Sequence, residues 1–383
     1  MSFLIKGRSV AVVEEVSYGA ANPVFTNADY IDYTAADISA DIEKIDRAVL
    51  RDSLLNLESL QGQETSSGSI SVEISGAVAG KVNGELLYEN GIGKKVAQAV
   101  ATTVASGTST TVFTLTSVAG LAVGQALKVT TGGSAQYTVI TNITGSVVTV
   151  SPALTGTPVA ADPVKGLLSF LLPKPKDTVT SLAVRENLKP TSGNNIDYDY
   201  LGVMVSEVSF DFPVGGISTA TFNLGGAGFT TKTPGSTPTT PCTLNTPVIG
   251  KNAIFKAMGN TYEAKDVKFT VSTEIFDVTA ITTDGLADKI VTAKTVTGSF
   301  SVMYDGTSNF DLFKTGTKGA ASLLLKDGGK TSPVITGFFM PNIKITSVKR
   351  TEDGGIFYDN IEFEVLSPDC DVNVEKALTV FFA

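Results

Sequence analysis

One nine-residue stretch occurs twice in this chain and constrains its fold more than any other feature. Residues 68–76 read GSISVEISG, and residues 298–306 read GSFSVMYDG. Both glycines, both serines and the valine match without a gap. In each copy small polar residues alternate with larger apolar ones, which is the two-residue period of a strand with one buried face. The repeat therefore predicts a fold built from two related halves.

A helix and a long hairpin follow each copy in the same order. The pattern predicts helices over residues 84–103 and 309–326. Each half then holds two alternating runs joined by Gly-Gly-Ile, because adjacent glycines allow the positive φ angles of a tight hairpin loop. The runs are residues 203–212 and 218–224 around Gly215 and Gly216, and residues 342–348 and 357–365 around Gly354 and Gly355. Strand, helix and hairpin in one order, twice, indicate an internal duplication.

The composition favours an all-β protein, because Gly, Thr, Ser and Val are abundant and long charged helices are few. Residues 106–162 hold four short β-like runs that have no counterpart in the second half. We expect them to form an inserted small β domain that projects outward from the main body. Residues 230–250 contain four prolines among threonines, a density that no helix or central strand tolerates, so this segment is a predicted linker.

These features divide the chain of 383 residues into two tandem β-sandwich domains, each with a short helix. The predicted parts are an N-terminal strand and arm over residues 1–45, a first domain in two pieces over 46–105 and 163–229, the insert over 106–162, the Pro/Thr-rich linker over 230–250, and a second domain over 251–383.

Two N-terminal segments each allow two interpretations. Residues 9–15 predict a short apolar strand, and the loop-rich arm after it is either a connector or an arm that reaches a neighbouring subunit. In residues 36–60, the spacing of Ile38, Ile42, Ile45 and Val49 fits an amphipathic helix. An extended lead-in to the repeated strand fits equally well, and the pattern does not separate the two.

The chain contains no histidine, which excludes Ser-His-Asp and Cys-His catalysis and every histidine-ligated metal site. Its acids lie singly in strands and turns, without the spacing of a catalytic pair. Cys242 and Cys370 lie in different halves and form no CxxC motif, so we expect free thiols in a protein made in a reducing cytoplasm, with a bridge between the two as the alternative. The sequence therefore predicts no catalytic residue, no cofactor and no metal site.

The charge and hydropathy patterns limit the partners. With 29 Lys and Arg against 38 Asp and Glu, the net charge of −9 argues against binding duplex DNA by phosphate neutralisation. No apolar run approaches the length that crosses a bilayer, and Met1–Lys6 is too short for a signal peptide.

Both hairpins have one apolar and one polar face. A β-sandwich with one solvated face explains this alternation fully. A second interpretation is that the polar face lines a pore, because long hairpins with free edges pair with other chains and a closed ring removes those edges.

The sequence resembles the tail tube (major tail) proteins of long-tailed, non-contractile bacteriophages, particularly the duplicated type that builds each ring from three chains. The resemblance is carried by the opening VAVVEEVSYGAANP (residues 10–23), by DRAVLRDSL (residues 46–54), by the two GS(I/F)SV strands and by the two hairpins. It implies a structural protein of the virion tail, made in the host cytoplasm, whose rings stack into a tube that conducts genomic DNA. The implied partners are copies of this chain and the tape measure, tail terminator and distal tail proteins, with no membrane contact.

The resemblance makes the polar faces candidates for the wall of the tube lumen. An acidic to neutral wall would repel phosphates and let DNA slide. The candidate lumen residues are Ser69, Ser71, Glu73, Glu207, Asp211, Ser299, Ser301, Glu362 and Glu364.

Two alternatives from other classes remain at this point. One is an adhesin or capsid-decoration module that binds a receptor without forming a tube. The other is a carboxylate-based glycosidase or lyase, for which the chain offers few sugar-stacking residues, with no Trp, 20 Phe and 10 Tyr.

Overall fold

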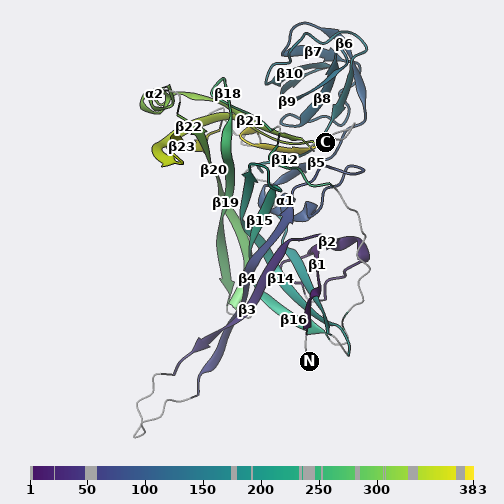
Figure 1. Cartoon of the computed structure of the whole chain (residues 1–383). Coiled ribbons are helices and arrows are strands. Elements are labelled where there is room, and N and C mark those ends of the chain that lie inside the picture. Colours follow the sequence, from purple (N-terminus) through teal and green to yellow (C-terminus); the bar gives the residue numbers. More distant parts are fainter. Residues whose placement is uncertain are drawn as a thin grey trace.

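The computed structural model describes residues 3–20, 22–47, 58–173, 179–190, 193–232, 235, 246–251, 253–280, 285–304, 306, 308–326, 335–367 and 376–383 (Figure 1). Cys242, Cys370 and most of the predicted linker lie outside these residues. The described part is almost entirely β-structure, with two α-helices and one 3-10 turn, η1 (Asn27–Asp29). The predicted all-β class is confirmed.

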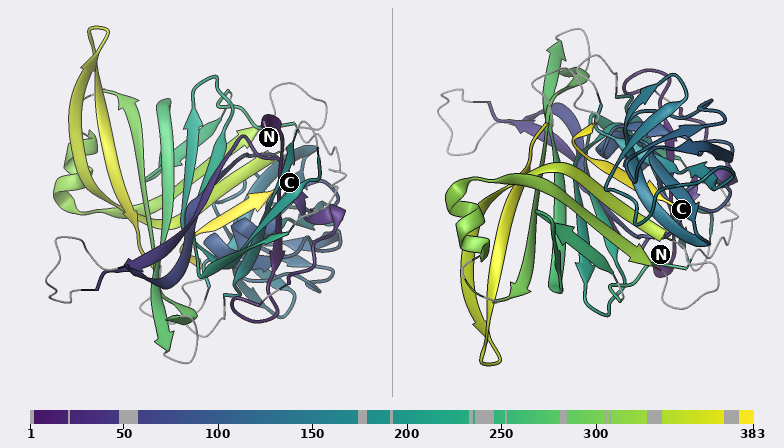
Figure 2. Two further views of the ribbon diagram at one scale, coloured as in Figure 1. Left: turned by 90° about the horizontal axis from the view of Figure 1, so that it is seen from below. Right: turned by 90° about the horizontal axis from the view of Figure 1, so that it is seen from above.

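One long antiparallel sheet runs through both halves of the chain and is named the central sheet here. Figure 2 shows it from below and from above, with the last and first hairpins of the sheet at opposite margins. Its strands, in spatial order, are β3 (Ala35–Ile45), β4 (Leu60–Glu73), β15 (Thr219–Gly226), β14 (Ile196–Pro213), β19 (Ala264–Ala280), β20 (Gly285–Met303), β23 (Ile356–Val365) and β22 (Ile335–Asp353).

The same strand order occurs in both halves of this sheet. The order β3–β4–β15–β14 of the first half recurs as β19–β20–β23–β22 in the second. The repeated nonamers begin at equivalent places, because β4 contains residues 68–73 and β20 contains residues 298–303. A bulge on β14 between Val205 and Glu207 has its counterpart on β22 between Ile345 and Ser347. The predicted strands and long hairpins are therefore present in both halves.

The two hairpin turns use their glycines in different ways. Gly215, Gly354 and Gly355 have φ angles of 70°, 60° and 82°, the left-handed region that glycine adopts without strain. Gly216 lacks such an angle, but a Cβ there would lie 2.8 Å from Cγ of Pro213. Any residue with a Cβ at this position would therefore clash with the ring of Pro213 across the turn.

Both predicted helices are shorter than expected. Helix α1 covers Glu85–Gly91 and is followed by strand β5 (Lys94–Val96), while α2 covers Ser308–Thr315 and is followed by β21 (Lys318–Lys326). Gly93 has a φ of 139° and Gly316 a φ of 62°, and neither angle continues a right-handed helix. The apolar residues of β21 alternate between buried and half-buried, which is a strand period that the prediction read as helix.

Residues 36–45 belong to β3 and residue 60 begins β4, so the amphipathic-helix alternative is wrong wherever the segment is described. The backbone of β3 pairs with β4 from Ala35 opposite Ser71 to Ile45 opposite Leu60. These ladder hydrogen bonds outweigh the helical spacing of the isoleucines. Val49 lies outside the described residues.

A second layer covers the apolar face of the central sheet. Strand β24 (Thr379–Phe382) pairs with both β12 (Leu168–Leu171) and β22, and β12 also pairs with β5. Strand β1 (Phe3–Glu14) pairs with β13 (Leu182–Pro190) and β2 (Tyr30–Ile31) of the same chain, which makes residues 9–14 part of this layer. The remaining strands of the layer are β16 (Gly228–Lys232), β17 (Ile254–Ala257), β18 (Asn260–Tyr262) and β21, which pairs with both β17 and β22.

The predicted insert forms a closed barrel at one end of the molecule (Figure 1). Its strands extend beyond residues 106–162 at both ends, and they are β6 (Thr102–Gly107), β7 (Val112–Leu115), β8 (Ala126–Thr131), β9 (Ser134–Thr144), β10 (Val147–Ser151) and β11 (Pro163–Gly166). The Gln125 side chain donates to the carbonyls of Ala97 and Leu167, and the rings of Tyr137 and Phe381 stack at 6.3 Å. The barrel is thus fixed to the body by packing as well as by its two connections.

The apolar side chains of both halves form one continuous core. Phe338 of β22 lies at its centre, with ring centroids 5.0 Å from Phe210, 5.1 Å from Phe212 and 5.5 Å from Phe269. Phe210 and Phe212 belong to β14 of the first half, and Phe269 belongs to β19 of the second. The halves are therefore held together by shared aromatic packing.

We predict that Phe338→Ala lowers the free energy of unfolding by about 3–5 kcal/mol, because it leaves a cavity between the halves. Urea denaturation measures this loss. The control Phe357→Ala removes a ring that is 51% exposed and is expected to cost about 0.5 kcal/mol or less. Equal losses in the two variants would contradict the central place of Phe338.

Candidate assembly surface

The nine candidate side chains from the sequence lie together on one face of the central sheet, named the polar face here. They come from four strands: Ser69, Ser71 and Glu73 on β4, Glu207 and Asp211 on β14, Ser299 and Ser301 on β20, and Glu362 and Glu364 on β23. Their neighbours along each strand, such as Ile70, Phe300 and Phe363, point into the core. Each of the nine is at least partly exposed. That this face lines the lumen of a tube stays a prediction.

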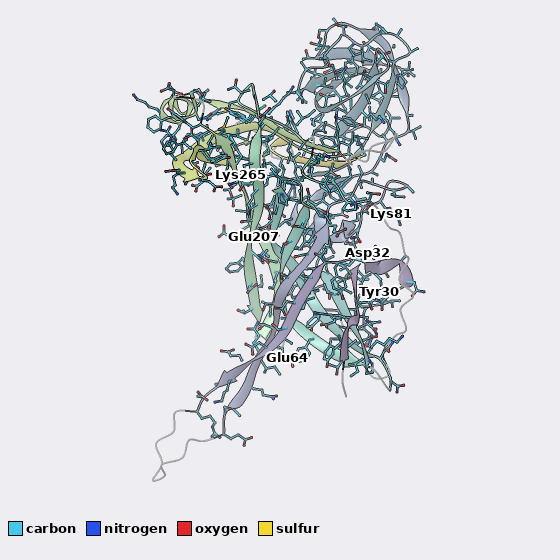
Figure 3. All side chains as sticks on the ribbon, viewed as in Figure 1. Tyr30, Asp32, Glu64, Lys81, Glu207 and Lys265 are labelled. Carbon is cyan, nitrogen blue, oxygen red and sulfur yellow. The ribbon has the colours of Figure 1, made fainter. Side chains whose placement is uncertain are left out.

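Polar contacts run across the face from one half to the other. The Glu207 carboxylate accepts hydrogen bonds from Asn223 at 3.0 Å and from Ser272 of β19 at 3.5 Å. Lys268 of β19 lies 3.5 Å from the carboxylate of Asp211. Figure 3 labels Glu207 midway along the sheet. The face is therefore one surface and not two separate patches.

Five further charged residues of this face were not predicted from the sequence. Residues Asp37 and Asp41 of β3, Asp266 and Lys268 of β19, and Lys349 of β22 share it, as their cross-strand partners show. The alternation in DVKFTVS, residues 266–272, predicts a strand over residues 267–273, but the polar side chains of that strand were not assigned to this face. For β3, the helix-like spacing of its isoleucines hid the same period.

Two strand edges of the central sheet stay open along part of their length. Among the described residues, β3 pairs with β4 alone, and β22 pairs with β23 alone from Ser347 to Asp353. On β3, Arg8 and Tyr200 donate side-chain hydrogen bonds to the carbonyls of Ala36 and Ile38. These contacts satisfy two acceptors of the β3 backbone within the single chain. Open edges of this kind favour pairing with another strand.

Comparison with known protein families identifies the chain. A family model described as phage tail tube protein matches residues 6–365. The chain belongs to the phage tail tube protein family. No curated protein matches it. As a tail tube protein it is a structural component of the virion tail that assembles with copies of itself and with other tail proteins.

The described part of the tail tube protein holds neither a cluster of metal-ligating side chains nor a helix that could span a membrane. No group of three or more acidic or cysteine side chains there is placed to hold a metal ion. No helix among those residues has both the length and the apolar character to cross a membrane.

A half-buried lysine connects the two halves of the tail tube protein at their junction. Lys294 of β20 donates from Nζ to the carbonyls of Asn90 at 3.2 Å and Gly91 at 2.5 Å, at the end of α1. An ammonium here complements the partial negative charge of the helix end. Burial lowers the pKa of Lys294 to about 7, because the charged form loses its hydration.

The low pKa predicts a pH-dependent stability. The unfolded chain keeps this proton up to the ordinary lysine range, whereas the folded chain releases it near pH 7. The free energy of unfolding is therefore expected to rise between pH 7 and 9, by up to about 1.4 kcal/mol per pH unit. Denaturation of Lys294→Met should show a flatter profile over this range. The surface control Lys251→Met should keep the wild-type slope, and an unchanged slope in Lys294→Met would contradict the assignment.

Proposed function

We propose that this tail tube protein forms rings of three chains with pseudo-sixfold symmetry, which stack into a tube that conducts genomic DNA. The observation that carries the proposal is the pairing of β14 with β19, from Glu207 opposite Ser272 to Pro213 opposite Asp266. This pairing joins two equivalent halves edge to edge in one sheet. The same contact, repeated between chains, closes the sheet into a ring without free edges.

The internal duplication that this symmetry needs is supported by strand register. Ile42 lies opposite Glu64 on the β3–β4 hairpin, and Thr273 lies opposite Lys294 on the β19–β20 hairpin. Glu64 and Lys294 each precede their copy of the nonamer by the same number of residues. Ile45 opposite Leu60 matches Phe276 opposite Ile290 in the same way.

Equivalence of the halves fixes the register expected between chains. On this basis β14 corresponds to β22, and β19 corresponds to β3. The pair Ser209 and Thr270 at the junction then corresponds to Lys349 of one chain and Ser39 of the next. The full contact runs from Ser347 opposite the neighbour's Asp41 to Asp353 opposite the neighbour's Ala35.

Stacking of the rings is supported by exposed apolar residues at both ends of the sheet. Ile217 and Ile356 occupy equivalent places after the two glycine turns, and each is 45% exposed. At the opposite end, Ile45, Leu60, Phe276 and Ile290 are exposed at equivalent places on the two hairpins. Exposed apolar residues kept in both halves favour burial against the next ring.

The polar face is the proposed lumen wall. Acids outnumber lysines on it, and Lys268 and Lys349 lie 3.5 Å and 3.4 Å from Asp211 and Glu362. The wall would thus offer DNA phosphates no unpaired cation at these positions. The barrel then faces outward, and the tape measure, terminator and distal tail proteins are the proposed partners in a virion assembled in the host cytoplasm.

Disulfide trapping tests the ring. We predict that Lys349→Cys combined with Ser39→Cys, with Cys242 and Cys370 changed to serine, yields covalent trimers on oxidation, because facing residues of paired strands are within disulfide reach. In the control, Lys349→Cys with Ala40→Cys places the two thiols on opposite faces and should not cross-link. Equal cross-linking in both would contradict the register.

Negative-stain electron microscopy of the purified chain tests the whole assembly. Hollow tubes or stacked rings with three-fold projections and outer knobs are expected. Particles that lack any ring form at high concentration would favour the decoration-module alternative.

The lumen assignment is tested by charge reversal. Tubes of Glu73→Lys/Glu207→Lys/Glu362→Lys should retain duplex DNA at low salt and release it as salt rises, because phosphate neutralisation releases counterions. Co-sedimentation of tubes with DNA measures this against wild type. Lysines at the exposed barrel residues Asn142, Thr144 and Ser146 provide the outer-surface control. Stronger retention by that control would contradict a lumen on the polar face.

A further inference from the structure

The two helices occupy equivalent places but differ in how they are covered. Each helix follows its copy of the nonamer and is itself followed by a strand, since α1 ends at Gly91 before β5 and α2 ends at Thr315 before β21. Helix α1 is surrounded, with Tyr88 fully buried among four phenylalanine rings. Helix α2 leaves Phe310 50% and Phe313 37% exposed. The second helix therefore has a surface that the single chain does not cover.

The junction between the halves shows what covers the end of α1. Gly91 lies against Val208 of β14, since a Cβ on this glycine would be 2.3 Å from a Val208 methyl group. Val208 pairs with Val271 of β19, so the helix end lies beside the line where the halves meet. From the far side of that line, Lys294 of β20 donates to the last carbonyls of the helix.

The charges of the Lys294–α1 contact are exchanged at the corresponding places on β4 and α2. Glu64 of β4 stands at the position equivalent to Lys294. At the end of α2, Lys314 and Lys318 are exposed, and neither forms an ion pair within the described part of the chain. Lys318 also lies directly opposite Lys344 across the β21–β22 ladder, where like charges repel, and Lys344 has one acid, Glu364 of β23, on its other side. This lysine cluster has the charge to receive an acid from outside the chain.

We infer that the C-terminal end of α2 is a contact site for a second copy of this chain, in which the neighbour's Glu64 meets Lys314 and Lys318. The inference rests on the proposed ring and adds a side-chain contact to its backbone pairing. In this contact the neighbour's β3 and β4 stand where β19 and β20 stand beside α1. Ile42, half-buried on the free β3, takes the place of Thr273, which is 8% exposed at the junction. Figure 3 labels Glu64 on the β3–β4 hairpin, away from the α2 end of the same chain.

Charge reversal with rescue tests this contact on the full chain. Each exposed or half-exposed ion pair of this kind contributes about threefold to an equilibrium constant, and a ring of three chains holds three of them. Glu64→Lys is therefore expected to lower the association constant for ring closure about 30-fold in sedimentation-velocity experiments. Combining it with Lys314→Glu and Lys318→Glu should restore at least two thirds of the lost association free energy. Circular dichroism confirms that each variant is folded.

Glu43→Lys is the matched control, because it makes the same charge change on the same hairpin, at the bulge beside Ile42. It should alter ring closure less than about threefold. The contact would be overturned if Glu43→Lys lost rings as strongly as Glu64→Lys. It would also be overturned if Lys314→Glu with Lys318→Glu failed to restore ring closure in the Glu64→Lys chain. If wild-type rings form and Glu64→Lys leaves them unchanged, the contact is wrong and the proposed ring stands. A wild-type chain that never forms rings overturns both.

Discussion

The pairing of β14 with β19 is the interaction on which the rest of the structure depends. It is a backbone ladder between β14, the last strand of the first half in the spatial order of the central sheet, and β19, the first strand of the second half in that order. Without it the two halves would each expose an open strand edge in the middle of the molecule. With it, the polar face is continuous, and Phe210 and Phe269 meet on opposite strands in one core. Backbone hydrogen bonds and aromatic burial thus act at the same place.

At the open edge of β22, charged residues stand at the positions that apolar residues occupy on β14 and β15 at the junction. Phe210 of β14 corresponds to Arg350 of β22, and its neighbour Ala220 corresponds to Asp359. Arg350 lies 3.2 Å from the Asp359 carboxylate and stacks 3.7 Å above the ring of Tyr304. A phenylalanine is suitable at a junction that forms within the chain and never meets water. In the proposed ring, an arginine would suit an edge that stays open until the neighbouring chain pairs with it, because charge on an edge strand suppresses indiscriminate pairing.

The sequence predicted the elements with a two-residue period far better than the rest. Repeated serines and alternating hairpins identified β4, β20, β14, β15, β22 and β23 and the face that carries the candidate residues. The helix lengths were wrong because Gly93 and Gly316 end the helices through backbone angles that composition alone does not reveal. The strand β3 was ambiguous because Ile38, Ile42 and Ile45 satisfy both periods once a bulge interrupts the ladder between Ile42 and Lys44. The β14–β19 pairing joins strands separated by the linker, and no local pattern encodes such a contact.

The polar face shows why net charge is a poor guide to how such a surface meets DNA. A total of −9 is compatible with a basic stripe, and only the arrangement of charges excludes one. Here the lysines of β19 and β22 are placed beside acids on neighbouring strands, Lys268 by Asp211 and Lys349 by Glu362. Each pair cancels within a few ångströms, well inside the screening length of about 8 Å at physiological salt. If this face lines the proposed lumen, DNA would meet the field of acids that form no ion pair within the described residues, among them Glu73 and Asp37. Such a field would repel phosphates weakly along the whole surface, and weak uniform repulsion would let a long polymer move without binding at any one place.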